Sequence, residues 1–260
     1  MKDAQLNWLL CPCRNGLHLT RAALQTFYSQ DIGNVAVMLI DNSEEGNTRW
    51  LPRDNKTVLL TCHSRPSRSV AESWNTGLRW IFAGGANHAL VVNNDVELRP
   101  DTYRHLLADG GEFVTAVGVR EKEKLGTEAF ITADKSRSAM LYPLPDPSLK
   151  RPHPDFSCFL IRRSAWDRVG PFDENFKIAF CEDWDYHVRL HRAGITACAL
   201  DLPFLHHASQ TVKLADDAEA RTIQRQADLN RAYFRRKWGV DGGTDAYYAL
   251  FGHPAPQEAA

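Results

Sequence analysis

Residues 90–100 read Leu-Val-Val-Asn-Asn-Asp-Val-Glu-Leu-Arg-Pro, and this stretch decides the expected fold. Together with Ala89, its first three residues form a short apolar run that predicts a strand buried on both faces. The run stops at a polar turn, which places Asp95 and Glu97 at the edge of a sheet. Because side chains alternate along an extended backbone, we expect the two carboxylates to point the same way while Val96 points inward.

Two carboxylates on one side of a strand end supply oxygen ligands that suit a hard divalent cation, Mg²⁺ or Mn²⁺. Such an ion keeps open coordination positions, and a diphosphate would bind there. Short acidic motifs also occur at ordinary strand ends, where the acids are solvated and the asparagines form turns. The stretch by itself leaves both interpretations open.

The overall composition is that of an ordinary globular protein. The chain has 260 residues, of which 43% are hydrophobic and 24% charged, and its formal net charge is -1. We expect one large α/β domain over residues 1–252, followed by a disordered tail at 253–260. The balanced charge excludes a global attraction to nucleic acid or membranes, so any partner must be recognised by a local site.

The sequence also bears on the compartment. No apolar run approaches the ~20 residues that span a bilayer, and the N-terminus lacks the apolar core of a signal peptide. The six cysteines are scattered, and the one close pair, Cys11 and Cys13, lacks the spacing of a zinc site. We therefore expect free thiols and a cytoplasmic protein without a transmembrane segment.

Strands and helices are expected to alternate along the first hundred residues. Four apolar runs have the pattern of strands, and two stretches have the pattern of helices. The strands are 6–11, 35–40, 58–61 and 89–92, and the helices are 20–29 and 69–82. Repeated alternation predicts a parallel sheet with right-handed crossovers. Ligands of such sheets bind at the carboxyl ends of the strands, where Asp41 and Asp95 are both expected.

The order of motifs resembles a known family. Asp-Asn-Ser at 41–43, Ser-Trp-Asn-Thr-Gly at 73–77 and Asn-Asn-Asp-Val-Glu at 93–97 are similar to the nucleotide-binding half of family 2 glycosyltransferases. The second half adds Val-Gly-Pro-Phe-Asp at 169–173 and Glu-Asp-Trp-Asp at 182–185, which resemble the acceptor side of that family. Two further segments fit the same order: 206–207 and 233–239.

This resemblance covers residues 6–239 and implies the GT-A fold. That fold is an α/β architecture with a Rossmann-like, mostly parallel central sheet flanked by helices and followed by a C-terminal helix. The chain would then divide into a nucleotide-sugar half at 1–100, an acceptor half at 101–215 and the helix at 216–239. The implied activity is transfer of a hexose or pentose from a nucleoside-diphosphate sugar to an acceptor hydroxyl.

The resemblance implies a site for Mn²⁺ or Mg²⁺ at Asp95 and Glu97. The family usually has Asp-x-Asp at this point, so Glu97 is a departure that would bind the ion directly or through water. A later histidine often completes the metal shell in the family, which indicates His207 or its neighbour His206. A neutral imidazole is a better ligand for Mn²⁺ than for Mg²⁺. The structural alternative is a histidine pair packed at a strand end.

Donor-binding residues are also implied. Asp41 matches the family aspartate that contacts the nucleotide base, commonly uracil, which favours a UDP-sugar donor. Asn42, Asn75 and Asn94 lie in the same motifs and are further candidates for donor contact. Arg68 precedes an expected helix, where it would meet phosphate. Without a ligand, Asp41 and Asn42 would instead cap a turn or a helix.

Transfer to a hydroxyl requires a general base that takes the acceptor proton. Asp183 is the candidate and Glu182 the alternative, because the amphipathic pattern from Trp184 onward places both near the start of a helix. The positive end of the helix dipole favours the ionised form that a base needs. A base on the far side of the donor implies direct displacement, hence inversion at the anomeric carbon. The structural alternative is that the two acids only cap the helix.

Two rival classes of protein share several of these features. A sugar-phosphate nucleotidyltransferase would have the same sheet and metal, but residues 11–16 lack a Gly-rich phosphate loop followed by Arg and Lys. The other rival is a catalytically silent protein of transferase shape that binds nucleotide sugars or carbohydrate. The presence of Asp95, Glu97 and Asp183 together argues against a catalytically silent protein.

The acceptor is left open by the sequence. Saccharides, lipid-linked saccharides, proteins, small metabolites and a modified base in DNA all offer a hydroxyl. The polar, proline-containing segment 118–154 predicts a long loop that would form part of the acceptor wall. Aromatic and basic residues of the expected C-terminal helix would permit a peripheral contact with an anionic membrane.

Overall fold

The computed structural model describes residues 6–43, 51, 58–64, 66–120, 138–139, 154–207 and 213–251. Most of the predicted loop at 118–154 and the predicted disordered tail at 253–260 lie outside the described residues. The strands are β1 (Asn7–Cys13), β2 (Val35–Asp41), β3 (Val58–His63), β4 (His88–Val92), β5 (Val96–Glu97), β6 (Phe113–Val119), β7 (Ser138–Ala139), β8 (Cys158–Arg162) and β9 (Ala197–His206). The helices are α1 (Leu17–Tyr28), α2 (Val70–Ala83), α3 (Thr102–Asp109), α4 (Arg163–Val169), α5 (Glu182–Arg192), α7 (Asp217–Trp238) and α8 (Asp245–Ala249).

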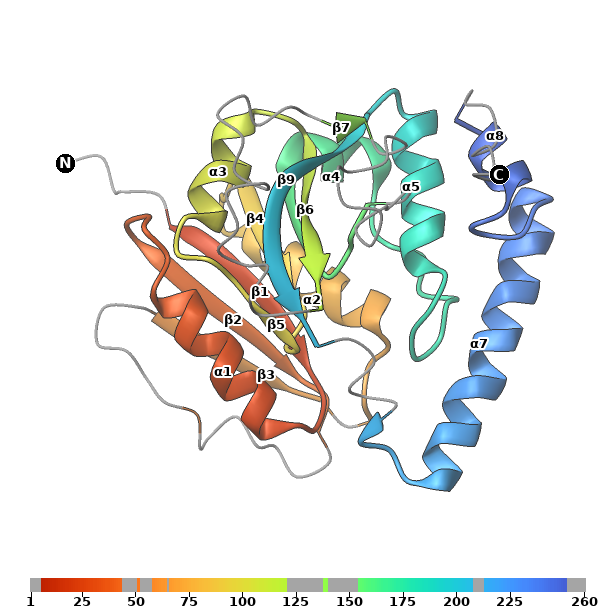
Figure 1. Ribbon diagram of the computed structural model, residues 1–260, viewed down its shortest axis with the longest axis horizontal. Helices are drawn as coiled ribbons and strands as arrows, with labels where there is room; N and C mark the ends of the chain where they lie inside the picture. Colours follow the sequence, from red (N-terminus) through yellow and green to blue (C-terminus); the bar gives the residue numbers. More distant parts are fainter. Residues whose placement is uncertain are drawn as a thin grey trace.

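The described strands form one sheet in the order β3-β2-β1-β4-β8-β6-β9-β5, with β7 beside β9 (Figure 1). Strands β1 to β4 pair in parallel, as predicted. Strand β8 is antiparallel to both β4 and β6, and β6 is parallel to β9. Strands β1, β2, β3, β4, β6 and β9 therefore share one direction, which confirms the prediction of a mostly parallel α/β sheet.

Side-chain alternation along the strands divides the core into two layers, one on each face of the sheet. Trp8 and Leu10 of β1 belong to an apolar cluster that includes side chains of α2, α4 and α5. Leu9 and Cys11 of the same strand belong to a second cluster with side chains of α1 and α3. All four are buried, so both faces of β1 are covered and its sequence is continuously apolar.

Helix α2 is fixed close to the sheet by two local features. Ser69 and Glu72 form a capping box, in which each side chain accepts a hydrogen bond from the other residue's backbone N–H. A Cβ at Gly77 would overlap the side chain of Leu10 on β1, so only glycine lets the helix lie this close. The predicted helix at 69–82 is confirmed, and its first turn is held beside the strand ends.

Helix α7 runs along the outside of α5 in Figure 1. A third apolar cluster joins α5, α7 and α8 through Val188, Phe234 and Tyr247. The Asp216 side chain caps α7 by accepting hydrogen bonds from the N–H groups of residues 218 and 219, so the predicted C-terminal helix is confirmed. Among the helices of the described ranges, none combines the length and apolarity needed to cross a bilayer.

Candidate active site

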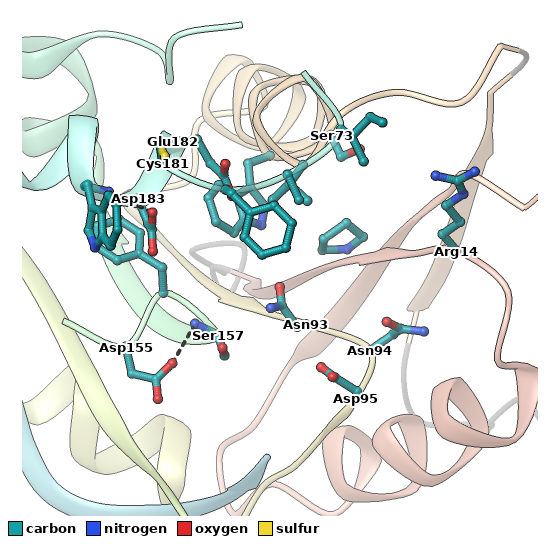
Figure 2. Close-up of a pocket in the computed structure, with 18 of the residues that line it drawn as sticks. Arg14, Ser73, Asn93, Asn94, Asp95, Asp155, Ser157, Cys181, Glu182 and Asp183 are labelled. Carbon is teal, nitrogen blue, oxygen red and sulfur yellow. Dashed lines mark hydrogen bonds between the residues drawn. The ribbon is translucent and has the colours of Figure 1, made fainter. Parts of the chain in front are cut away.

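A cavity of about 520 Å³ opens at the carboxyl ends of β1, β2 and β4, where parallel sheets bind their ligands. Its walls come from the turns after these strands, the start of α2, the segment 154–157 and the segment 178–184 that leads into α5. Helix α7 contributes Ile223 and Arg231. The volume lies within the ~300–1,000 Å³ of small-molecule sites. Asp183 and Asp95 lie on opposite sides of the cavity in Figure 2.

Asp95 lies in the turn between β4 and β5, and it is 8% exposed. Its backbone carbonyl accepts a hydrogen bond from the N–H of His207, which ties the turn to the end of β9. One carboxylate oxygen is 3.5 Å from Nε2 of His206, and the same nitrogen is 3.3 Å from Oγ of Ser157. Asp95, His206 and Ser157 all line the cavity, so an acid, an imidazole and a hydroxyl meet at this end.

Glu97 does not share this position. Its Oε1 is 2.9 Å from Nε2 of His207, so the acids and histidines form two separate pairs: Asp95 with His206, and Glu97 with His207. The alternation argument for residues 95 and 97 does not apply, because β5 contains only residues 96 and 97 and Asp95 precedes it in a turn. Of the two acids, Asp95 is the one that lines the cavity. A role for Glu97 and His207 in metal binding stays a prediction.

Besides Asp95, which is also predicted to bind the donor, three of the predicted donor residues line the cavity: Asn42, Arg68 and Asn94. The Asn42 side chain donates to Oγ of Ser73 and accepts from the backbone N–H of Arg68, so it joins the end of β2 to the start of α2. The amide of Asn94 donates to Oγ1 of Thr20 at 3.0 Å. These amides hold the turns after β2 and β4 in place, and Arg68 adds a cation to the cavity wall.

Asp41 lies deeper than predicted. Its side chain is fully buried and accepts a hydrogen bond from the N–H of Ser43 at 3.0 Å, which is the geometry of an Asx turn. It does not belong to the described cavity lining. Residues 44–50 and 52–57, which follow this turn, lie outside the described part of the chain. A contact between Asp41 and a nucleotide base therefore stays a prediction.

Asn75 does not belong to the described cavity lining. It is fully buried, its amide nitrogen donates to the carbonyl of Phe172 and to the carboxylate of Glu174, and its oxygen accepts from the N–H of Phe172. These bonds join α2 to the Gly-Pro-Phe-Asp segment, at a position behind the cavity wall. The polar groups of Asn75 are engaged within the protein, and a contact between Asn75 and the donor stays a prediction.

Glu182 and Asp183 are the first residues of α5, which confirms that the acids lie at a helix start. Asp183 is partly exposed to the cavity, and its carboxylate accepts a hydrogen bond from the N–H of Trp184. Glu182 is 6% exposed; burial, assisted by the neighbouring Asp183 carboxylate, raises its pKa to about 8. Of the two acids, Asp183 has the accessible carboxylate.

The backbone that leads into these acids is strained. Ile178, Phe180 and Cys181 have φ values of 61°, 83° and 73°, in the left-handed region that side chains other than glycine rarely adopt. Each such residue costs about 1–3 kcal/mol and persists only where the surroundings enforce it. Such strain is concentrated at functional sites in proteins, and here all three residues line the cavity.

Known structures share this fold. Mannosyltransferase PcManGT from Pyrobaculum calidifontis, in complex with GDP-Man and Mn²⁺, matches with a TM-score of 0.60 at 16% sequence identity, over 96% of this chain and 68% of that one. S. aureus TarS 1-349 matches with a TM-score of 0.55 at 15% identity, over 90% of this chain and 74% of that one. The chain has a GT-A-like glycosyltransferase fold. No protein-family model and no curated protein matches the sequence.

Within this glycosyltransferase fold, sequence reasoning missed many residues of the cavity wall, among them Arg14, Asp155, Ser157 and Phe180. Arg14 follows β1 and forms a 2.6 Å ion pair with Glu219 of α7, which joins two distant parts of the chain. Asp155 accepts a hydrogen bond from the N–H of Ser157 (Figure 2). Phe180 is 41% exposed and is a large apolar residue of this wall. For Asp155 and Ser157 the sequence offered one signal of a site, because these polar residues lie directly before the apolar run 158–161.

Proposed function

We propose that this chain is a metal-dependent, inverting glycosyltransferase that moves a sugar from a nucleoside-diphosphate sugar to an acceptor hydroxyl. One observation carries the proposal. A single cavity has an acid–imidazole pair at one end, Asp95 with His206, and an accessible carboxylate at the other, Asp183. The first group suits the diphosphate side of such a reaction and the second suits the attacking hydroxyl.

The residues at the Asp95 end fit a divalent cation. Asp95 offers carboxylate oxygens, and Nε2 of His206 lies 3.5 Å from one of them. No cluster of three or more His, Cys, Asp or Glu side chains suited to a metal occurs in the described part of the chain. An ion held by few protein ligands is completed by water and substrate phosphates. An imidazole ligand favours Mn²⁺ over Mg²⁺.

The cation, when bound, would neutralise the negative charge that grows on the leaving diphosphate. Asp95 and His206 would hold it there, with Glu97 and His207 as the adjacent pair. Arg68 contributes a further positive charge in the same wall. Asn42 and Asn94 keep the surrounding turns in place through their amide hydrogen bonds.

Asp183 is the proposed general base. Its carboxylate lies at the helix start on the cavity wall opposite Asp95, so an acceptor hydroxyl between them would attack from the side away from the diphosphate. Removal of the hydroxyl proton as the new bond forms makes a single displacement sufficient and inverts the anomeric carbon. Glu182 fits this role less well, because it is 6% exposed, whereas Asp183 is accessible from the cavity.

Calorimetric titration with UDP-, GDP- and dTDP-sugars, each with Mn²⁺ and again with EDTA, tests the proposal. UDP is favoured by the match at Asp41, and GDP by the ligand of the PcManGT structure. We expect one nucleotide sugar to bind in the presence of Mn²⁺ and to lose affinity by about 100-fold in EDTA. Metal-dependent binding without turnover would indicate the silent binding protein, and an absence of binding across the panel would overturn the proposal.

A further inference from the structure

The segment 177–181 forms the wall from which Asp183 reaches the cavity, and its conformation needs an external support. Three of its residues have left-handed backbone angles, and Ile178 is β-branched, the type of side chain least tolerant of such angles. It has no helix or strand of its own before α5 begins at Glu182. Figure 2 shows Cys181, Glu182 and Asp183 together on one wall of the cavity.

One side chain from a distant helix supplies much of this support. Asn230 of α7 is 1% exposed, and its amide nitrogen lies within 2.8 Å, 2.8 Å and 3.1 Å of the carbonyl oxygens of Lys177, Ala179 and Phe180. Its amide oxygen accepts from the backbone N–H of Lys177 at 3.2 Å. The same oxygen accepts from Nε2 of Gln226, one helical turn earlier. A single buried amide therefore satisfies backbone groups that no regular structure satisfies.

The helix that carries Asn230 is itself anchored to the acceptor side. Lys237 lies 2.6 Å from a carboxylate oxygen of Asp173 and 2.6 Å from one of Asp185. The indole of Trp238 donates to Asp185 at 2.8 Å. Asp185 belongs to the first turn of α5, two residues after Asp183. The two contacts with Asp185 fix the position of α7 relative to α5. Asn230 of α7 is therefore held in place beside the segment 177–181.

We propose that Asn230 is a positioning residue for the acceptor side of the reaction. By holding the segment 177–181 in its left-handed conformation, it keeps the Asp183 carboxylate and the exposed Phe180 ring turned toward the acceptor. An exposed aromatic ring beside the base offers an apolar face for a sugar ring, which favours a saccharide acceptor. This inference rests on the proposed function.

The test compares wild type with Asn230→Ala and with a control on the same helix, Gln224→Ala, whose exposed side chain contacts Asp228 only among the described residues. The probe is the nucleotide sugar that binds best in the calorimetric panel, and turnover is its Mn²⁺-dependent hydrolysis with water as acceptor. For Asn230→Ala we expect kcat to fall about 30-fold while donor Kd and KM stay within about twofold. Amide hydrogen exchange over residues 177–183 should become at least about tenfold faster.

A rescue variant separates positioning from general stability. Glycine adopts left-handed angles without strain, so Cys181→Gly in the Asn230→Ala background should reduce the need for the clamp. We expect the double variant to recover about tenfold in kcat over Asn230→Ala. If Asn230 contributed only to the overall stability of the fold, the glycine at position 181 would give no such recovery, because it does not replace the lost contacts of Asn230.

Each outcome decides the inference. Unchanged exchange over 177–183 in Asn230→Ala, or equal losses in kcat and donor affinity, would overturn it. If Asn230→Ala does not fold, Gln226→Ala decides instead. Among the described residues, this substitution removes only the hydrogen bond to the amide oxygen of Asn230, and we expect kcat and the exchange protection of 177–183 each to fall about threefold. If wild type binds no nucleotide sugar, the proposed function fails, and the exchange result still shows whether Asn230 holds the segment.

Discussion

The two ends of the cavity are built in different ways. The Asp95 end rests on regular strand pairing, since β4 lies between β1 and β8 and β5 pairs with β9. The Asp183 end follows the segment 170–181, which has no helix or strand and contains three residues other than glycine with left-handed backbone angles. Buried amides of Asn75 and Asn230 hold that segment from two separate helices. Strand pairing thus places the turn that carries Asp95, and isolated side-chain contacts hold the segment that leads to Asp183.

The largest effect on turnover is expected at the irregular end. In Asp183→Asn the side chain keeps its shape, but the amide cannot take the proton from the acceptor hydroxyl. Turnover should therefore fall about 1,000-fold while donor affinity stays within about twofold. Nucleotide release and calorimetric titration measure the two quantities. Asp167→Asn is the control, because Asp167 is an exposed acid of α4 that pairs only with Arg163 among the described residues. Full turnover in Asp183→Asn would remove Asp183 from the role of base.

At the regular end the expected change is in affinity. Asp95→Asn removes one charged ligand from the proposed cation site, so nucleotide affinity with Mn²⁺ should weaken about 10- to 100-fold. The backbone should not move, since the hydrogen bond from His207 goes to the carbonyl of residue 95 and not to its side chain. Titration of both proteins with Mn²⁺ and with EDTA checks this. We expect wild type and Asp95→Asn to bind the nucleotide equally in EDTA and differently in Mn²⁺. The same loss of affinity under both conditions would contradict a role of Asp95 in metal binding.

The contrast between the two ends also explains what the sequence could predict. Strands β1 to β4 and helices α2 and α7 were predictable, because apolar period, a capping serine and a capping aspartate are local signals. The location of Asp95 at a strand end and of Asp183 at a helix start follow from the same signals. The antiparallel position of β8 between β4 and β6 was not predicted, because pairing partners are set by the whole sheet.

The missed parts depend on contacts between residues far apart in the sequence. Asn75 has the polar side chain of a donor ligand, and its hydrogen bond to Phe172, 97 residues away, was not predicted. The separate pairing of Glu97 with His207 depends on the residue at which β5 begins. The pattern of apolar and turn residues in the sequence does not fix a strand boundary to one residue. No local signal marks Asn230 as the partner of the segment 177–181. Amide side chains in particular have the same appearance in sequence whether they bind a ligand or the backbone.

A smaller effect on turnover is expected for Glu182→Gln, at most about threefold near neutral pH, because glutamine resembles the protonated acid. Its effect should lie in stability. Burial raises the folded-state pKa of Glu182 to about 8, so between about pH 5 and pH 8 the unfolded chain releases a proton that the folded chain retains. As pH rises through this window, the unfolding free energy of wild type should therefore fall relative to that of Glu182→Gln. Above about pH 8 the difference between the two proteins should stay constant.

Chemical denaturation of both proteins at several pH values measures this difference. The pH–rate profile provides the comparison with the proposed base. If Glu182 were the base, wild-type turnover would rise as pH passes about 8 and Glu182→Gln would lose it. An unchanged profile in the variant agrees with Asp183 instead.

The smallest effect on donor binding is expected for Asn75→Ala, in which the structure and the family pattern make opposite predictions. The substitution removes three hydrogen bonds and leaves the buried N–H of Phe172 without its acceptor, so unfolding free energy should fall by about 2–4 kcal/mol. Donor affinity should stay within about twofold, since the amide faces the Gly-Pro-Phe-Asp segment. Thr76→Ala, at the next position of α2, is the matched control, because its hydroxyl bonds only to the carbonyl of Glu72 in the described structure. A folded Asn75→Ala protein that binds donor about tenfold more weakly would mean that clamping of the irregular segment reaches the nucleotide side, and the two ends could no longer be treated as independent.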